Sequence, residues 1–291
     1  MLFHVSCRLE YAVRFPSTLI LNVHAQHNES QTIVTEQFGV DPVVPLEHFS
    51  VPGSENRFVR LDTGDLKTLV VTYSATVDCN YDILAAKNLE ELPISEIPPE
   101  VIPFLFSSRY CQSDKLCRLA WDLFGKLPTP HRKVVGIVDW IHNNVEYLSG
   151  TTDWGTSAYD TVIQRTGVCR DFAHLGIALC RALNIPARYF TGYSYQLDPP
   201  DFHALFEAYL GGRWALFDAT GLAPLNGLVR IGTGRDAADA AVATIFGGVS
   251  TKSMTVECRL GEGQTFIPLE RPDLNKSAVA LETGERGASA P

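Results

Sequence analysis

Three side chains of the kinds used in nucleophilic catalysis stand in separate segments of the sequence: Cys169, His203 and Asp218. A cysteine thiolate attacks a carbonyl carbon, and a nearby imidazole can take the proton of the thiol. A carboxylate bound to the other ring nitrogen fixes the imidazole tautomer and stabilises the imidazolium. If the fold brings these three side chains together, they predict acyl transfer at an amide bond through a thioester.

Cys169 lies near the start of a predicted helix that ends at about Asn184 and Pro186. Thr166 is the expected N-cap and Gly167 permits a tight entry, which puts Cys169 at the third helical position. The unpaired N–H groups and the positive dipole end of a helix favour a thiolate there. Apolar residues recur at helical spacing along one side of this helix: Phe172, Leu175, Leu179 and Leu183.

A second stripe of this helix carries only small side chains. Ala173, Gly176 and Cys180 lie on nearly the same side as Cys169, at about 100° per residue. Another element can therefore approach the helix closely where the sulfur emerges. We expect that element to be the sheet that carries His203 and Asp218.

Gly211–Gly212 separates two alternating apolar runs, a strong signal for a two-residue hairpin turn. Such a turn pairs Leu210 with Arg213 and fixes the register of the whole hairpin. In that register His203 and Asp218 are diagonal neighbours on one face, with Cβ atoms at most about 7–8 Å apart. A carboxylate at that separation can hold an imidazole N–H.

Other histidines and acids in the sequence are expected to be structural or solvated. His174 is five residues after Cys169 and points about 140° away from it around the helix. His24 and His27 are expected to be solvated strand residues; they have no third ligand at a suitable spacing, so we expect no metal and no cofactor. Asp171 is expected to be a first-turn acid, Asp201 a turn residue, and His131 and His142 solvent-facing.

Composition and charge narrow the class of protein. The 291 residues are 45% hydrophobic and 20% charged, with a net charge of −9. This acidic balance argues against binding to nucleic acid or to an anionic membrane surface. The sequence shows no leader pattern and no apolar run of about 20 residues, which predicts a cytoplasmic protein. The seven cysteines include no CxxC pair and are expected to be reduced thiols.

The chain is expected to divide into four parts. Residues 1–90 contain short β-rich runs between turn residues, which predict a small antiparallel β-sandwich. Residues 91–104 form a proline-bearing linker, residues 105–267 the catalytic domain, and residues 268–291 a polar, disordered tail. Within the catalytic domain the apolar spacing predicts helices at about 113–126, 131–146 and 158–165.

Three blocks around the candidate residues closely resemble the transglutaminase-like core: the segment 167–173 with 181–193 after it, His203 in Phe-His-Ala, and Asp218 in Phe-Asp-Ala-Thr. The resemblance covers roughly residues 105–225. The N-terminal β-rich part resembles the region that precedes this core in bacterial transglutaminase-like proteins. The resemblance implies an α+β, papain-like fold, with helices packed on an antiparallel sheet, and thiol acyl transfer on a peptide or protein amide.

The resemblance also implies roles outside the triad. Eukaryotic members use an aromatic residue upstream of the cysteine to stabilise the oxyanion; Tyr147 lies in the matching place, with Trp154 as the alternative. The short interval between Cys169 and His203 argues against the calcium loops of animal transglutaminases. The segment 234–239 resembles a recurrent downstream motif, and helix capping by Asp236 or a site role are both open.

The expected activity is that of a transglutaminase-like cysteine protease or amidase, with Cys169 as the nucleophile. Three alternatives remain: transamidation with an amine acceptor, a catalytically silent binding or scaffold protein of the same fold, and a metal hydrolase. The natural substrate and the oligomeric state do not follow from the sequence.

Overall fold

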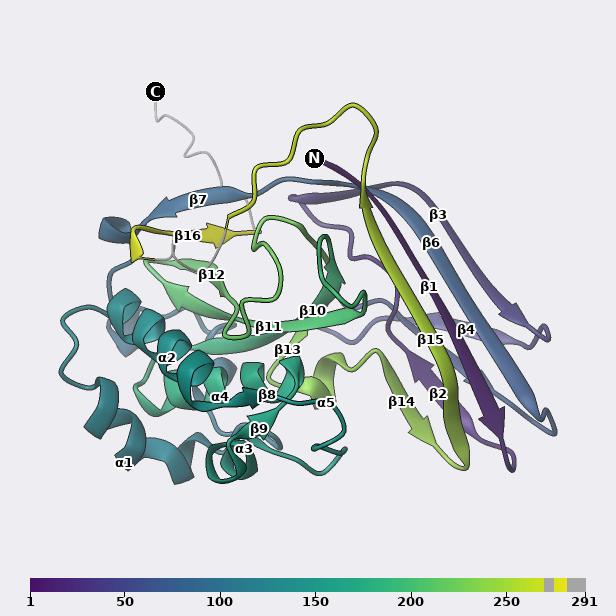
Figure 1. Ribbon diagram of the computed structural model, residues 1–291, viewed down its shortest axis with the longest axis horizontal. Helices are drawn as coiled ribbons and strands as arrows, with labels where there is room; N and C mark the ends of the chain where they lie inside the picture. The colour runs from purple at the N-terminus through teal and green to yellow at the C-terminus, as the bar shows by residue number, and fades with distance from the viewer. Residues whose placement is uncertain (270–274, 282–291) are drawn as a thin grey trace. The chain divides into compact units, whose positions relative to one another are not determined.

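The computed structural model describes residues 1–269 and 275–281 (Figure 1). The chain forms two units that interleave along the sequence. Unit 1 comprises Met1–Cys79, Tyr189–Leu205 and Gly221–Leu269. Unit 2 comprises Asn80–Arg188, Phe206–Thr220 and the C-terminal segment, described from 275 to 281. These units do not coincide with the predicted division of the chain, because strands late in the sequence complete the sheets begun by earlier ones.

Unit 1 is built on two antiparallel four-stranded sheets (Figure 1). The first has the order β15 (Val249–Leu260), β1 (Leu2–Val13), β6 (Thr68–Cys79) and β3 (Gln31–Asp41). The second has the order β14 (Ala243–Phe246), β2 (Thr18–Leu21), β5 (Phe58–Asp62) and β4 (Leu46–Phe49). Each sheet thus receives one strand from beyond residue 240, and side chains of both sheets share one buried core. The predicted N-terminal β-sandwich is confirmed, with two late strands added to it.

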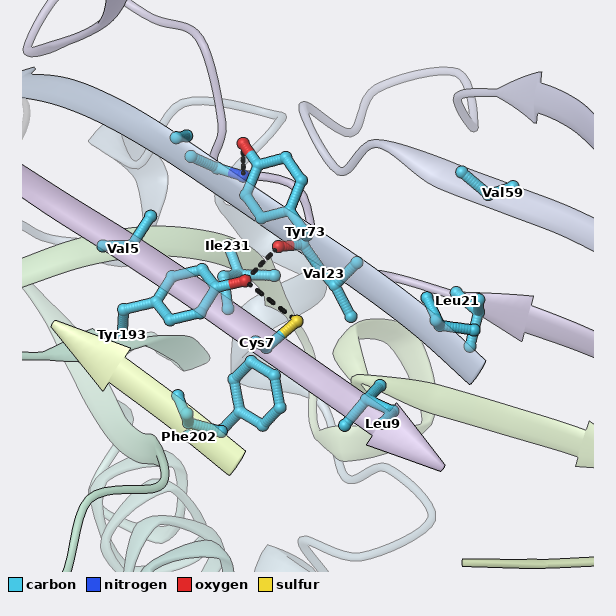
Figure 2. Packing of buried hydrophobic residues seen from close by; sticks show 14 of the residues in the cluster. Val5, Cys7, Leu9, Leu21, Val23, Val59, Tyr73, Tyr193, Phe202 and Ile231 are labelled. Atoms are coloured by element: carbon cyan, nitrogen blue, oxygen red, sulfur yellow. Dashed lines mark hydrogen bonds between the residues drawn. The ribbon is translucent and has the colours of Figure 1, made fainter. Parts of the chain in front are cut away.

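Tyr193 anchors β10 (Ala187–Ser194) in this core (Figure 2). Its hydroxyl donates to the carbonyl of Val23 at 2.7 Å and lies 3.5 Å from Sγ of Cys7. Burial raises the pKa of Cys7 to about 11, so its thiol stays protonated near neutral pH. From Tyr189 to Ser194, β10 pairs antiparallel with β13 (Leu228–Gly234), which leads to the short helix α5 (Ala237–Ala240).

His24 is buried in unit 1, although the sequence suggested a solvated side chain. Its ring lies 4.8 Å from the ring of Phe38 and 4.9 Å from that of Tyr73. Burial, and secondarily the charge of Arg57, lowers the pKa of His24 to about 4. The folded protein therefore holds this imidazole neutral.

We predict that unit 1 loses stability when the pH falls from 6.5 to 4. The unfolded chain protonates His24 near the ordinary pKa of 6.5, whereas the folded chain protonates it only near pH 4. Stability from this residue is thus complete above pH 6.5 and falls by about 3 kcal/mol on acidification. Urea unfolding of the wild type should show this slope, and His24→Phe should flatten it. His27→Gln, at an exposed position, should leave the slope unchanged; an unchanged slope in His24→Phe would contradict the prediction.

In the described part of unit 2, helix α4 (Cys169–Ala182) packs against three other α-helices. These are α1 (Ser113–Phe124), α2 (Pro130–Asn144) and α3 (Ala158–Gln164), close to the predicted bounds. The strands of this unit pair in the order β11 (Phe202–Leu210, from Phe206 on), β12 (Arg213–Phe217), β16 (Ser277–Ala280) and β7 (Asp82–Ala85). Short 3₁₀ turns occupy Ala86–Asn88, Ile94–Glu96 and Ile102–Leu105.

Two sequence predictions for unit 2 need correction. The segment 91–104, expected to be an extended linker, forms two 3₁₀ turns and buries Ile97 and Val101 against Trp214. The tail predicted to be disordered from 268 contains β16, which is hydrogen-bonded to β7 and β12. Pairing with distant strands, not local composition, gives Ser277–Ala280 its structure. Residues 270–274 and 282–291 of that predicted tail lie outside the described residues.

Across residues 1–269 and 275–281, every helix is too short or too polar to span a lipid bilayer.

Candidate active site

Cys169 is the first residue of α4, not the third helical residue expected from the sequence. The N-cap is Val168, because Thr166–Gly167 is drawn into a short strand, β9, that pairs in parallel with β8 (Glu146–Tyr147). This extended pairing carries the chain past Thr166 before the helix begins. The correction places Cys169 two residues nearer to the positive end of the helix dipole.

Asp171 holds the start of α4 in place from a fully buried position. One carboxylate oxygen accepts the N–H of Val168 at 3.0 Å, and the other accepts Nε and Nη2 of Arg170 at 3.2 and 3.0 Å. The expectation of a first-turn acid is therefore confirmed. Gly167 leaves room for this arrangement, because a Cβ at 167 would lie 2.8 Å from Cβ of Asp171.

Hydrogen-bond donors converge at the helix start. The carbonyl of Val168 accepts the N–H groups of Asp171 at 2.8 Å and of Phe172 at 3.1 Å. The N–H groups of Cys169 and Arg170 precede these first helical bonds and have no intrahelical acceptor. They are therefore suited to bind an anionic oxygen near the sulfur.

Exposure distinguishes Cys169 from Cys180, which lies on the same stripe of α4. Cys169 is partly exposed, whereas Cys180 is fully buried. Burial also raises the pKa of Cys180 well above that of an ordinary thiol. Of these two cysteines, only Cys169 is both partly exposed and at a helix start.

The stripe of small side chains packs against β11, as the sequence predicted. A Cβ placed on Gly176 would lie 2.5 Å from the ring of Phe206, so a hydrogen atom is all that fits there. The Phe206 ring is itself fully buried and stacks on Phe217 with centroids 5.8 Å apart. Glycine at 176 thus sets how closely α4 lies to the strand.

Gly176→Ala is predicted to destabilise the protein by about 1–3 kcal/mol, less the roughly 1 kcal/mol that alanine gains in helix propensity. The added methyl group meets a buried ring that has no free space to move into. Gly136→Ala in α2 is the matched control, because its short contact is the end of the flexible Leu127 side chain. Urea unfolding of both variants should show a loss at 176 and little change or a gain at 136; equal effects would contradict the packing argument.

The hairpin has the predicted register. Gly211 and Gly212 have φ values of 58° and 81°, the left-handed geometry of a tight two-residue turn. Leu210 pairs with Arg213, and the ladder continues to Phe206 opposite Phe217. Glycine is suited to both turn positions because neither φ value is readily adopted by other residues.

His203 and Asp218 lie at the far end of this hairpin, past its last paired residues. His203 precedes Phe206 by three positions on β11 and is buried, as is Asp218, which directly follows β12. Oδ1 of Asp218 accepts both the N–H of Thr220 at 2.8 Å and its hydroxyl at 2.7 Å. Cys169 and Asp218 belong to unit 2 and His203 to unit 1, so the joining of all three stays a prediction.

Asp201 lies in the irregular segment directly before β11, two residues from His203 in the sequence. Burial raises the pKa of the Asp201 carboxyl, while the Phe202 N–H at 2.6 Å and the charge of His203 act in the opposite direction. The Asp201 carboxylate therefore interacts electrostatically with His203.

Tyr147 lies beside the segment that leads into Cys169. It pairs with Gly167 across the β8–β9 ladder, and its ring is 5.8 Å from that of Phe172. Its side chain is partly exposed, and Trp154 in the following loop is largely exposed. Both candidates for the oxyanion role are thus in the part of the chain that adjoins the start of α4.

Other sequence candidates have structural positions. His174 is fully buried with its ring stacked on Tyr110 at 5.0 Å, consistent with the structural role expected of it. His131 is buried, contrary to the expectation that it faces solvent. Asp236 caps α5 by accepting the N–H of Ala238 at 2.9 Å. Within the described ranges, no three His, Cys, Asp or Glu side chains are grouped closely enough to hold a metal ion.

Arg170 has a role that the sequence analysis missed. Besides Asp171, its Nη2 binds the carbonyl oxygen of Asp153 at 2.7 Å, which ties the loop after β8 to the first turn of α4. The pairing of Arg170 with Asp171 could have been suspected, because the two residues are adjacent and Asp171 lies in the first turn of the helix. The bond to the Asp153 carbonyl could not be predicted from the sequence near Arg170.

Comparison with known proteins defines the class. Residues 1–100 match the bacterial transglutaminase N-terminal domain, and residues 118–219 match the transglutaminase-like superfamily. The chain belongs to this superfamily. A crystal structure from Cytophaga hutchinsonii, described as that of a candidate cysteine protease, is 53% identical, with a TM-score of 0.93 over 97% of this chain and 98% of that one.

Curated relatives match over a shorter region. An uncharacterised protein of Mycobacterium leprae is 32% identical over 120 residues, which are 38% of this chain and 43% of that protein. An uncharacterised protein of Mycobacterium tuberculosis is 32% identical over 114 residues, which are 34% and 36% of the two chains. The chain thus spans less than half the length of these curated relatives.

Proposed function

We propose that this protein is a thiol-dependent hydrolase of amide bonds, a cysteine protease or amidase, with Cys169 as its nucleophile. The observation that carries the proposal is a partly exposed cysteine at the first position of α4, next to N–H groups without intrahelical acceptors. Membership of the transglutaminase-like superfamily and the similarity to a candidate cysteine protease support it.

In the proposed mechanism, His203 takes the proton of the Cys169 thiol, and Asp218 orients the imidazole and stabilises its cation. Extending the hairpin register beyond Phe206 supports this pairing, because it makes the two residues diagonal neighbours. The bonds of Asp218 to Thr220 fix one carboxylate oxygen and so restrict the direction of the other.

Sulfur then bonds to the amide carbonyl carbon, and the carbonyl oxygen becomes an oxyanion bound by the N–H groups at the start of α4. Collapse of this intermediate breaks the C–N bond, His203 gives its proton to the leaving amine, and a thioester remains on Cys169. Water, deprotonated by His203, attacks the thioester and releases a carboxylic acid and the thiol. Tyr147 is proposed as a further donor to the oxyanion.

Competitive alkylation tests the proposal. At about pH 6, where ordinary thiols near pKa 8.5 react slowly, we expect iodoacetamide to label Cys169 faster than Cys117. Cys117 is the matched comparison because it is the more exposed of the two, so accessibility alone predicts the opposite order. His203→Ala should lower labelling at Cys169 to that of Cys117. Faster labelling of Cys117 in the wild type would contradict the proposal.

A further inference from the structure

The loop that follows β8 is tied to the start of α4 from both of its ends. At its beginning, the N–H of Leu148 donates to the carbonyl of Gly167 at 2.9 Å. Further along, Arg170 donates to the carbonyl of Asp153 at 2.7 Å. The loop main chain therefore lies against the residues that immediately flank Cys169.

A third contact holds the main chain of the loop at Trp154. The hydroxyl of Tyr110 donates to the carbonyl of Trp154 at 2.9 Å, and the Tyr110 ring stacks on His174 of α4. Asp153 closes the turn internally, because its Oδ1 accepts the N–H groups of Gly155 at 2.7 Å and Thr156 at 3.1 Å. A fixed backbone therefore presents the Trp154 side chain.

Large apolar side chains of this loop nevertheless face solvent. Tyr147 is 43% exposed, Leu148 42% and Trp154 78%, all within eight residues of otherwise polar or small sequence. We call these three side chains the apolar patch. Three large exposed apolar side chains on one short loop are characteristic of a binding site, whereas isolated exposed residues are ordinary.

We propose that the apolar patch binds a large apolar side chain of the substrate, on the acyl side of the bond that Cys169 attacks. The inference rests on the proposed function. After the amine leaves, the acyl group stays on the sulfur beside this loop, so contacts there act on the part of the substrate that remains bound. Aromatic rings pack well on Trp and Tyr faces, and a loop already held in place loses little freedom on binding.

The charges around the loop agree with an apolar occupant. The guanidinium of Arg170, the cation nearest in sequence to Cys169, is engaged by Asp171 and by the Asp153 carbonyl. It is therefore committed to holding the loop and is poorly placed to select an acidic substrate side chain. The substrate class that follows is a peptide amide with Phe, Tyr, Trp or Leu next to the scissile carbonyl.

Alkylation with two matched peptidyl reagents tests the inference. Benzyloxycarbonyl-phenylalanyl chloromethyl ketone carries the expected side chain, the glycyl analogue lacks it, and iodoacetamide reports the reactivity of the thiol alone. Rates at Cys169 should favour the phenylalanyl reagent by about tenfold in the wild type, as expected for partial burial of a benzyl group. Trp154→Ala should reduce this preference to about twofold, with the rate of each peptidyl reagent divided by the iodoacetamide rate of the same variant.

Trp121→Ala is the matched control, because Trp121 is also an exposed tryptophan but lies on α1. It should keep the tenfold preference. Equal rates for the two reagents in the wild type, or an undiminished preference in Trp154→Ala, would overturn the inference while rapid iodoacetamide labelling upholds the proposed function. Slow iodoacetamide labelling of Cys169 would instead overturn the proposed function, and this inference with it.

Discussion

Cys169→Ala is expected to reduce the hydrolysis of p-nitrophenyl acetate and of labelled casein by about a thousandfold or more, because the proposed mechanism takes its nucleophile from this residue. Oxyanion binding without a nucleophile leaves little residual activity in enzymes of this kind. Alanine at the first position of α4 is a good helix former, so the fold should be unchanged. Initial rates, with circular dichroism as the check on folding, measure the effect.

Cys117→Ala is the control for this experiment, because it removes a more exposed thiol from α1 without touching the start of α4. Its activity should equal that of the wild type. Retention of activity in Cys169→Ala would exclude Cys169 as the nucleophile, whereas loss of activity in Cys117→Ala would show that removing an unrelated thiol also lowers the activity.

Arg188→Met is expected to destabilise unit 2 by about 3–5 kcal/mol, the largest effect on stability that we predict. Nε of Arg188 donates to Glu207 at 2.6 Å, and the Glu207 side chain is fully buried. The guanidinium also lies over the Trp214 ring, 4.2 Å from its centroid. Removing the cation leaves a buried carboxylate without its counter-charge, which is far less favourable than an intact pair. Urea unfolding at neutral pH measures the loss.

The double variant Arg188→Met/Glu207→Met separates the cost of an unpaired charge from that of altered packing. Two apolar side chains of similar volume can replace a buried ion pair with little loss. The double variant should therefore recover most of the stability lost in Arg188→Met. If the double variant is less stable than Arg188→Met, the unpaired charge of Glu207 is not the cause of the loss, and the prediction is wrong.

Local signals in the sequence were sufficient for some of this structure. Gly211–Gly212 fixed the turn type and hence the register from Leu210–Arg213 to Phe206–Phe217. The small stripe on α4 indicated a close approach, which Gly176 makes with the Phe206 ring. Both features depend on residues close in sequence or on a geometric repeat, and such features are readable without a structure.

Features that depend on distant pairing were not predicted. Thr166 is the better cap by residue type, yet Val168 begins the helix because Thr166–Gly167 pairs with Glu146–Tyr147. The addition of β14, β15 and β16 to early strands has no local signature at all, so the predicted domain boundaries could not anticipate it.

The candidate site, too, was only partly predictable from the sequence. Residue types and motif blocks made Cys169, His203 and Asp218 the candidates. The structure adds that Cys169 is partly exposed at the helix start and that one carboxylate oxygen of Asp218 is held by Thr220. The role of Arg170 in holding the loop at Asp153 emerged only from the fold, because the two residues are far apart in sequence.

Trapping the acyl group on the protein tests the central claim most directly. Wild-type protein mixed with p-nitrophenyl acetate, quenched in acid during turnover and digested, should carry an acetyl group on the peptide that contains Cys169, and hydroxylamine should remove it as it removes other thioesters. Cys169→Ala should carry no such group, and His203→Ala much less of it. Turnover by the wild type with no acetyl group on Cys169, or with the group on another residue that Cys169→Ala still acetylates, would contradict the account.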